Sequence, residues 1–382
     1  MNRLDKIKES GQYRTLRVNE QEGAYIFPGN DQKLLNLSSN DYLGLASNLH
    51  LQEQFYQEIA AQSNALRLSA SSSRLLTGNF SIYEKVEQLL QSLYKREGAL
   101  IFNSGYHANT GILPALAGSS DLILADKLVH ASIIDGLKLS SADSLRYRHN
   151  DMNHLRKLIQ DKKESYNLIY IATESLFSMD GDEADLKALV DLKREFPQVR
   201  LYIDEAHAVG VRGNNGLGIC EEQDLISEID FLVGTFGKAL AGVGAYVICS
   251  NEHKELLINT MRTLIFTTGL PPVNLYWSYF ILKRLSSFHK EREQLRTIIT
   301  LLKQDECFRS CVSNSQIMPL MVGDSAKAME LSLELQNRGF FALAVRPPTV
   351  PQGTARIRLS LRADLPLEEM NQFLATIKQL TL

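Results

Sequence analysis

Short apolar runs recur through the first two thirds of the chain and predict strands that are buried on both faces. The runs are rich in β-forming residues and cover 99–102, 122–125, 168–172, 201–203 and 231–233. Several of the stretches between them, such as 185–196, have helical spacing instead. Alternating strands and helices are typical of a mostly parallel sheet with helices on both sides, so we expect a large α/β domain.

A further helix is predicted at 81–96, where apolar residues recur at helical spacing. It begins with Ser81 and Glu84, a spacing typical of a capping box, in which the first side chain accepts a hydrogen bond from the helix start. We therefore expect Ser81 to cap this helix.

The pattern changes after the prolines at 271–272. A long helical region reaches about residue 303, and a second helix from about residue 325 is ended by Gly339. The segment 356–362 alternates strictly, which predicts a strand with one apolar face and one strongly cationic face. Apolar residues at helical spacing predict a last helix at 365–380. We expect an N-terminal segment (1–45), a large domain (46–270) and a smaller α+β domain (271–382).

The composition is that of a folded globular protein, with 44% hydrophobic and 22% charged residues in a chain of 382. Its 41 basic and 44 acidic residues leave a net charge of −3, which provides no basic field for nucleic acid or anionic membrane. Residues 1–8 lack the apolar core of a secretion signal, and the weakly polar stretch 239–249 is too short for a membrane span. We expect a cytoplasmic protein with small-molecule partners, no nucleic acid and no membrane.

The four cysteines are too few and too scattered for a disulfide framework. Cys307 and Cys311 have a spacing compatible with one helix face, but the neighbouring sequence offers no second Cys or His pair to complete a tetrahedral site. We expect no metal.

Residues with possible catalytic side chains follow two of the predicted strands. They lie at the carboxyl ends of the strands, where a parallel sheet binds ligands. The run 201–203 leads into Asp204 and His207, and the run 231–233 leads into a glycine-bearing turn with Lys238. Each has a structural reading: Asp204 as a cap, His207 as a loop residue, and Lys238 as a solvated charge. A lysine held in a tight turn beside apolar segments is partly desolvated, which favours the nucleophilic amine that forms Schiff bases.

Two nucleotide-binding motifs do not fit the same segments. A P-loop would require glycine and a hydroxyl residue where Leu232 and Ala239 stand, and no G-x-G-x-x-G follows a predicted strand. Pyridoxal phosphate fits better, because it needs an imine-forming lysine, a partner for its ring nitrogen and a phosphate cradle. Lys238, Asp204 and the turn 103–105 at the start of a predicted helix (106–117) are the candidates, and Thr235 adds a hydroxyl.

Four motifs, at 39–45, 177–181, 204–207 and 235–238, together resemble those of the α-oxoamine synthases, a family of pyridoxal-phosphate enzymes. The likeness extends from about residue 36 to residue 362. It implies the pyridoxal-phosphate-dependent transferase fold of type I, the aspartate aminotransferase type, and a homodimer. By analogy with that fold, Thr267 or Thr268 would reach the phosphate of the neighbouring subunit.

The resemblance also implies roles for individual residues. Lys238 would form the Schiff base, Asp204 would pair with the ring nitrogen, and His207 and Ser178 would lie near the ring hydroxyl. His130, which from the sequence alone has only a structural reading, would stack on the ring and polarise the acyl carbonyl. Gly105, Tyr106 and Thr235 would bind the phosphate.

On the substrate side, the resemblance implies that Arg358 binds the carboxylate of an amino acid and that Thr349 lines the pocket. The motif at 346–351 and the segment 353–358 look most like the members that condense L-alanine with a pimeloyl thioester, carried by coenzyme A or by a carrier protein. Arg14 would receive the far carboxylate of the acyl chain, although Arg17 lies close in sequence and is the alternative.

Three rival functions stay open. One is a sister synthase, such as a glycine C-acetyltransferase, which the segment 239–242 resembles equally well. Another is an aminotransferase of the same fold. The third is a non-catalytic partner of the family, against which the presence of Lys238 argues.

Overall fold

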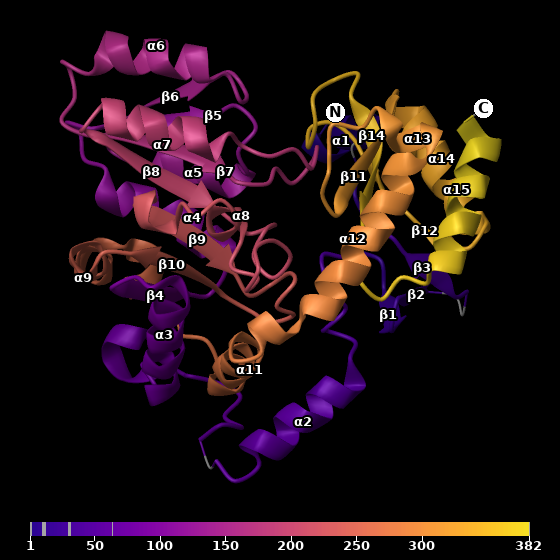
Figure 1. Ribbon diagram of the computed structural model, residues 1–382, viewed down its shortest axis with the longest axis horizontal. Coiled ribbons are helices and arrows are strands. Elements are labelled where there is room, and N and C mark those ends of the chain that lie inside the picture. Colours follow the sequence, from indigo (N-terminus) through magenta and orange to yellow (C-terminus); the bar gives the residue numbers. More distant parts are fainter. Residues whose placement is uncertain (1, 10–12, 30–31, 63, 382) are drawn as a thin grey trace. The chain divides into compact units, whose positions relative to one another are not determined.

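The computed structural model describes residues 2–9, 13–29, 32–62 and 64–381. The contacts within the chain define two compact units, each of which is described by itself (Figure 1). The large unit comprises Asn48–Ser178 and Glu183–Lys290. The small unit comprises Met1–Ser47, Met179–Asp182 and Glu291–Leu382.

Among the described residues of the large unit, a seven-stranded sheet forms the centre. The strands run in the order β4 (Gly98–Phe102), β10 (Ala245–Cys249), β9 (Phe231–Thr235), β8 (Val199–Asp204), β7 (Ile169–Glu174), β5 (Leu122–Asp126) and β6 (Asp143–Tyr147), which Figure 1 shows. Those from β9 to β6 pair in parallel, whereas β10 is antiparallel to both of its neighbours. The predicted mostly parallel sheet is confirmed. Each predicted apolar run falls in one of its strands, except that Leu168 lies one residue before β7.

Two strands of this sheet, β6 and β10, lie outside the predicted runs. The edge strand β6 exposes all but one of its residues, so it carries no continuous apolar run. The strand β10 occupies the second half of the weakly polar stretch 239–249 and is fully buried. The segment 236–244 that connects it to β9 is shorter than the dozen or so residues that a parallel crossover needs, so β10 runs antiparallel to β9.

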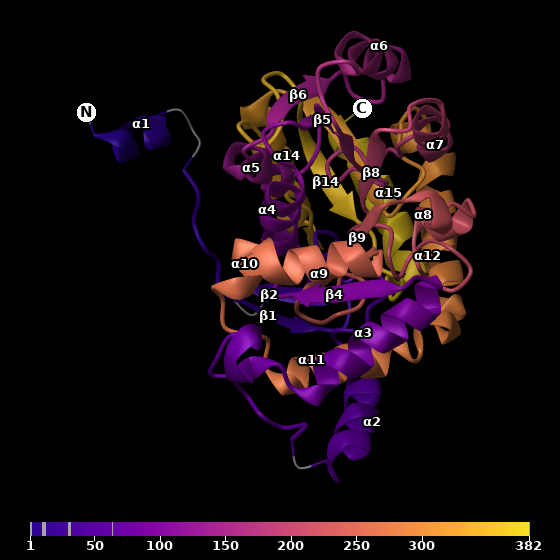
Figure 2. The same cartoon turned by 90° about the vertical axis from the view of Figure 1, so that its left-hand side faces the viewer.

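Helices cover the sheet of the large unit. Side chains from six of its strands pack with α4 (Gly105–Leu116), α5 (Ala131–Leu139), α9 (Asn251–Thr260) and α10 (Arg262–Ile265) in one hydrophobic core. Figure 2 shows the ribbons of these four helices. Elsewhere, α3 (Ser81–Tyr94) contacts β4 and β10, and α7 (Leu186–Glu195) contacts β8. The remaining helical elements are α2 (Leu49–Ile59), η1 (Arg74–Gly78), α6 (Met152–Lys162), α8 (Ile219–Glu222), η2 (Ile226–Glu228), α11 (Pro272–Leu282) and η3 (Leu285–Ser287).

The start of α3 differs from the expected capping box. Phe80 is the N-cap residue, no side chain caps the helix there, and Ser81 lies inside its first turn. The apolar spacing was interpreted correctly, because Ile82, Val86 and Leu90 are all buried. The predicted capping box was wrong, because the Ser-x-x-Glu pair lies one residue inside the helix. At that position the Ser81 side chain is exposed and does not cap the helix.

Two differences between the unit boundaries and the expected domain boundaries lie at the two ends of the large domain. Helix α11 belongs to the large unit, where Trp277 and Phe280 pack against Phe55 of α2. The N-terminal segment belongs to the small unit, where β3 pairs with β12 in one sheet. Both differences arise from contacts between residues far apart in sequence, which a change in composition along the chain does not reveal.

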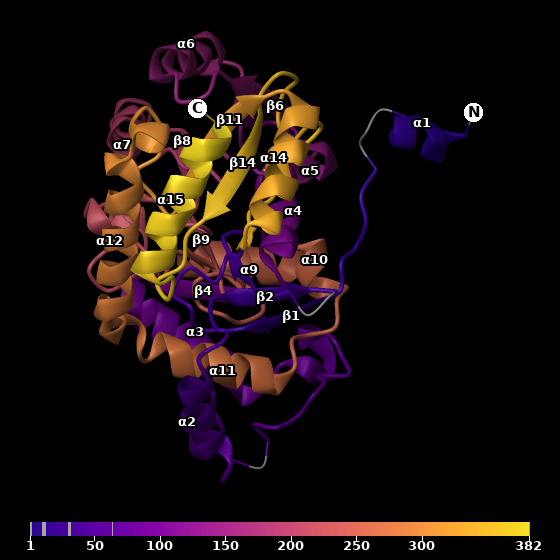
Figure 3. The same cartoon turned by 90° about the vertical axis from the view of Figure 1, so that its right-hand side faces the viewer.

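The described residues of the small unit have an α+β architecture with two sheets. One contains β1 (Asn19–Glu22), β2 (Tyr25–Pro28), β3 (Leu34–Asn36) and β12 (Phe340–Phe341), and the other contains β11 (Ile317–Gly323), β14 (Ala355–Ser360) and β13 (Ala344–Val345). Its helices are α1 (Arg3–Glu9), α13 (Glu306–Arg309), α14 (Ser325–Asn337) and α15 (Leu367–Thr381), and α12 (His289–Gln304) crosses the boundary between the units. Figure 3 shows α14 and α15 beside β14. Within the described part of the chain, no helix is both long and apolar enough to cross a membrane.

The motif at 177–181 crosses from the large unit into the small one. Gly181 has φ +68°, and a Cβ there would lie 2.1 Å from the carbonyl oxygen of Ile317, so the position requires glycine. Asp180 forms an ion pair with Arg356 of β14. These contacts explain why Met179–Asp182 forms part of the small unit.

The arginines of the segment 356–362 do not form a solvated cationic face. Arg356 and Arg362 are 3% and 1% exposed. Arg362 contacts Asp364 at 2.6 Å, Asp41 at 3.5 Å and Ser47 at 2.9 Å. Both buried arginines thus have polar partners, which a buried guanidinium needs in order to be stable. Asp41 belongs to the motif at 39–45, so Arg362 ties that motif to the small unit.

We expect Arg362→Met to lower the free energy of unfolding by about 3–5 kcal/mol, because it leaves the buried Asp41 carboxylate without its cation. Urea unfolding would measure the change. Arg338→Met is the control, since Arg338 is exposed and its guanidinium donates to Gln379. A loss below about 1 kcal/mol, the range of surface ion pairs, would contradict the importance of this cluster.

Candidate active site

Polar residues gather at the carboxyl ends of neighbouring parallel strands in the large unit. The last residues of β5, β7, β8 and β9 are Asp126, Glu174, Asp204 and Thr235. All are buried, and Glu174 and Asp204 are direct partners in the ladder between β7 and β8. Parallel pairing therefore brings several carboxyl groups to one edge of the sheet, where an open α/β sheet binds ligands.

Asp204 is held by two donors. Its Oδ1 accepts a hydrogen bond from the backbone N–H of Ala206 at 2.9 Å, and its Oδ2 accepts one from Asn109 Nδ2 at 2.8 Å. The bond to Ala206 fits the structural reading of Asp204 as a turn cap. A carboxylate accepts about four hydrogen bonds, so Asp204 keeps capacity for another donor.

Lys238 and His207 contact each other, with 2.8 Å between Lys238 Nζ and His207 Nε2. His207 is buried and Lys238 is half-buried. The turn that carries Lys238 is closed by Thr235, whose hydroxyl donates to the carbonyl of Gly244 and accepts from the N–H of Gly237. The solvated reading of Lys238 is therefore incorrect, because burial and the imidazole restrict its amine.

The neighbouring Glu205 fixes the loop that carries His207. It is fully buried and accepts hydrogen bonds from the Ser175 hydroxyl and from the backbone N–H groups of Ile219 and Cys220. Burial raises the pKa of Glu205, and these donors oppose the shift. The side chain joins β7, β8 and α8, so the His207 loop has little freedom to move.

His130 is the N-cap residue of α5 and connects to Asp204 through two buried side chains. Its Nδ1 lies 2.7 Å from the Ser132 hydroxyl, which accepts from Asn109 Nδ2 at 2.9 Å, and Asn109 donates in turn to Asp204. The His130 residue is exposed overall, but desolvation of its inner edge lowers its pKa. The Asp204 charge opposes this shift, and the Lys238 charge adds to it.

The predicted phosphate cradle lies at the start of α4. Ser104 is the N-cap residue, and its hydroxyl accepts from the N–H of His107 at 3.2 Å. A Cβ on Gly105 would meet no atom within 4 Å, so space is open in front of the first residue of the helix. Tyr106 is 52% exposed, and its hydroxyl donates to Asp135 at 2.7 Å. The helix begins one residue earlier than predicted.

Three further residues predicted from the sequence, Ser178, Thr267 and Thr268, lie in loops of the large unit. Ser178 is buried in the loop after β7. Thr267 and Thr268 lie beside Asn103 of the same chain, whose Nδ2 donates to the Thr268 carbonyl at 2.6 Å. A reach toward a second subunit stays a prediction.

The residues expected to bind substrate belong to the small unit. Arg14 Nη2 donates to the Thr349 hydroxyl at 2.9 Å, and Arg17 Nη1 donates to Gln336 at 3.0 Å. Arg14, Arg17 and Thr349 line a groove of about 910 Å³ with apolar walls that include Leu333 and Val345. Arg358 is half-buried on β14 and donates to Ser360. It also lowers the pKa of Tyr42, which burial otherwise raises.

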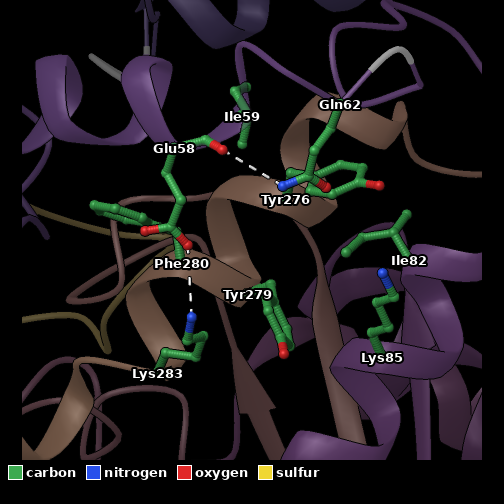
Figure 4. A pocket seen from close by; sticks show the side chains of 9 residues that line it. All are labelled: Glu58, Ile59, Gln62, Ile82, Lys85, Tyr276, Tyr279, Phe280 and Lys283. Carbon is green, nitrogen blue, oxygen red and sulfur yellow. Dashed lines mark hydrogen bonds and ion pairs between the residues drawn. The ribbon is translucent and has the colours of Figure 1, made fainter.

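A smaller pocket of about 270 Å³ in the large unit contains none of these residues (Figure 4). It lies among α2, α3 and α11, and Figure 4 shows Glu58 between Gln62 and Lys283. Glu58 pairs with Lys283 at 3.5 Å and with Arg284 at 2.8 Å. This pocket is not the candidate site. None of the strand-end residues lines it, and an ion pair occupies its wall.

Comparisons with known proteins agree with this geometry. The model of the aminotransferase class I and II family matches residues 32–377. A relative from Haemophilus influenzae (strain 86-028NP), provisionally named 8-amino-7-oxononanoate synthase, is 52% identical over 98% of both chains.

Two solved structures are also similar to this chain. The first is a serine palmitoyltransferase from S. paucimobilis with a bound pyridoxal-phosphate adduct (TM-score 0.89, 28% identity), and it covers 98% of this chain and 95% of its own. The second is 8-amino-7-oxononanoate synthase from Francisella tularensis (TM-score 0.75, 28% identity), which covers 91% of this chain and 97% of its own.

The chain therefore belongs to the class I and II aminotransferase family and, within it, to the α-oxoamine synthases, which are pyridoxal-phosphate-dependent acyltransferases of fold type I. The residues present fit this cofactor. Lys238 supplies a half-buried amine, Asp204 a buried carboxylate with spare acceptor capacity, and α4 an N-terminus facing open space.

Asn109 and Ser132 were not identified from the sequence. Asn109 is 2% exposed on α4, where it accepts from the Tyr202 hydroxyl at 2.6 Å and donates to both Asp204 and Ser132. Asn109 could have been found from the sequence, because it is an amide among the apolar residues of the predicted helix at 106–117. A buried amide needs hydrogen-bond partners, so such a position indicates a polar network.

We expect Asn109→Leu to weaken retention of pyridoxal phosphate about 10- to 100-fold, because a hydrogen bond to a charged group contributes about 1.5–3 kcal/mol. Cofactor content after dialysis, followed by absorbance, would measure this. Asn259→Leu is the matched control, since Asn259 is exposed and donates only to the Glu255 carbonyl. Equal retention in both variants would mean that Asn109 does not orient Asp204.

Proposed function

We propose that the protein condenses L-alanine with a pimeloyl thioester to give 8-amino-7-oxononanoate, carbon dioxide and a free thiol, as in biotin synthesis. The observation that carries the proposal is the contact between Lys238 and His207 at the strand end next to the buried Asp204. The relative at 52% identity, which covers 98% of the chain, supports the choice among the α-oxoamine synthases.

The residues of the large unit have distinct proposed roles. Bound pyridoxal phosphate supplies an electron-withdrawing ring that stabilises negative charge at the substrate Cα. Lys238 would hold the cofactor through its aldehyde, and its amine would take the Cα proton of bound alanine. His207 lies within hydrogen-bond distance of that amine and keeps it oriented. Asp204 would accept the ring N–H, and Ser178 would lie near the ring hydroxyl.

Two further groups of the large unit complete this proposal. His130 would stack on the ring and donate to the acyl carbonyl. Its connection through Ser132 and Asn109 to Asp204 supports a common orientation for the two side chains. Gly105, Tyr106 and Thr235 would hold the phosphate at the N-terminus of α4, where the helix dipole favours a dianion.

The residues of the small unit are proposed to select substrate. Arg358 binds the alanine carboxylate through its two donors, and Thr349 lines the acyl pocket. Arg14 binds the far carboxylate of the pimeloyl chain. The apolar walls of the groove that Arg14 and Thr349 line would suit the methylene chain of such an acyl group, with the guanidinium available for its charged end.

A second copy of this chain is the proposed partner, and the cytoplasm the proposed compartment. Exposed apolar side chains support the dimer: Leu68, Leu76 and Phe266 are 81%, 79% and 71% exposed. Leu76 lies in η1, which contacts α10, and Phe266 directly follows α10. Large apolar side chains concentrated on contacting elements are typical of a protein interface.

The proposal is tested by adding L-alanine and then pimeloyl thioester to the holoenzyme while the cofactor absorbance and free thiol are recorded. We expect a spectral shift with alanine and thiol release only after the thioester. Lys238→Ala should lower turnover by at least about 10²–10⁴-fold, because it removes the proton acceptor. Lys187→Ala, which alters an exposed lysine of α7, is the control.

The same assay separates the rivals. Turnover with glycine and acetyl thioester in place of the proposed substrates would assign a sister synthase. Conversion of the cofactor to its amine form without thiol release would assign an aminotransferase. Full turnover by Lys238→Ala would contradict the roles of this lysine, and absence of any cofactor band in the wild type would contradict the catalytic proposal.

We expect Arg14→Gln to raise KM for pimeloyl thioester about 10- to 100-fold with little change in kcat, because it removes a charge-assisted hydrogen bond. Heptanoyl thioester, which lacks the far carboxylate, should be unaffected by this substitution. Arg17→Gln is the matched control on the same segment. A specific rise in KM with Arg17→Gln would transfer the role to Arg17, and equal effects on both thioesters would exclude carboxylate recognition by Arg14.

A further inference from the structure

A second carboxyl group lies next to Asp204, and neither the sequence motifs nor the proposed mechanism uses it. Glu174 is the last residue of β7 and pairs with Asp204 in the ladder to β8. Paired residues of neighbouring strands point to the same face of a sheet, so both carboxyl groups lie on one side of it. Glu174 is 2% exposed.

The Glu174 carboxyl group lies near the backbone N–H of His130, at the start of α5, which lowers its pKa. Among the described residues, its oxygen Oε1 finds no hydrogen-bond partner, although it is buried. An ionised carboxylate with an unpartnered buried oxygen is costly, whereas a protonated one has no charge to solvate.

The charged groups around Glu174 also favour its protonated form. Burial is the largest effect, followed by the charge of Asp204 on β8, with a smaller one from Asp126 on β5. Lys238, from the turn after β9, and the N–H of His130 act in the opposite direction. The net result raises the pKa of Glu174 to about 8. At pH 7 the neutral acid is therefore favoured over the carboxylate.

We propose that Glu174 is a positioning residue that works as a neutral carboxylic acid, holding the backbone of His130 and leaving Asp204 as the ionised member of the pair. The inference rests on the proposed function, because it takes Asp204 and His130 as the groups that face the cofactor. If Glu174 and Asp204 were both ionised, the negative charge beside Lys238 would be doubled. Protonation of Glu174 avoids this, and its carboxyl group still offers an acceptor to the backbone N–H of His130.

The protonation state is tested by infrared difference spectroscopy between the wild-type holoenzyme and its Glu174→Gln variant at pH 6.5. We expect the wild type to show the carbonyl band of a protonated carboxylic acid, which the variant lacks. In the wild type this band should disappear as the pH rises through about 8. Glu164→Gln, which changes an exposed carboxylate, should leave the band unaltered. Absence of the band from the wild type would overturn the proposal.

The positioning role is tested by the dissociation constant of the cofactor at pH 6.5. Glu174→Gln keeps a neutral acceptor for the His130 N–H and should bind the cofactor within about twofold of the wild type, whereas Glu174→Leu should bind it about tenfold more weakly. A tenfold loss with Gln would show that the negative charge is needed, and equal binding by Gln and Leu would show that Glu174 positions nothing; either overturns the proposal.

Neither readout uses a substrate, so failure of this inference is distinguishable from failure of the proposed function. A wild-type protein that shows the protonated band but releases no thiol from pimeloyl thioester would contradict the proposed reaction alone. A protein that releases thiol but lacks the band would contradict the role of Glu174 alone.

Discussion

Parallel pairing of β5, β7, β8 and β9 is the constraint on which the site depends. It places the carboxyl ends of the strands at one edge and therefore brings Asp126, Glu174 and Asp204 close together in a buried setting. Carboxyl groups so arranged repel one another and lose hydration, so each requires donors, a cation or a proton. The surrounding contacts supply all three: Asn109 donates to Asp204, Lys238 lies at the next strand end, and protonation fits Glu174.

The same rule governs the small unit, although there the buried charges are positive. Arg356 and Arg362 are almost fully buried, and each is paired with an aspartate far away in sequence, Asp180 and Asp41 respectively. Arg362 also pairs with the nearby Asp364. The distant pairs join β14 and the residues that follow it to Met179–Asp182 and to the motif at 39–45. The motifs that resemble those of the family therefore also contain residues whose contacts stabilise the small unit. Asp41, Asp180 and Gly181 have contacts of this structural kind.

Much of the fold could be predicted because its strands are short, apolar and buried on both faces. The five runs and the helix at 81–96 were visible from composition and spacing alone. The edge strand β6 could not be recognised in this way, because it is mostly exposed and carries no apolar run. The membership of α11 was also invisible, since the aromatic contact of Trp277 with Phe55 joins residues far apart in the chain.

For the site, the order of residues along the chain is enough to predict which chemical groups are available: an amine in a turn after one strand, and a carboxylate and an imidazole after another. This is so because strand ends in a parallel sheet share one edge. The partners of these groups, by contrast, follow from the folded arrangement of the strands. The 2.8 Å contact of Lys238 with His207, the link from His130 to Asp204 and the unpartnered oxygen of Glu174 all depend on which strands are neighbours. Strand order is set by packing of the whole sheet, and local sequence does not encode it.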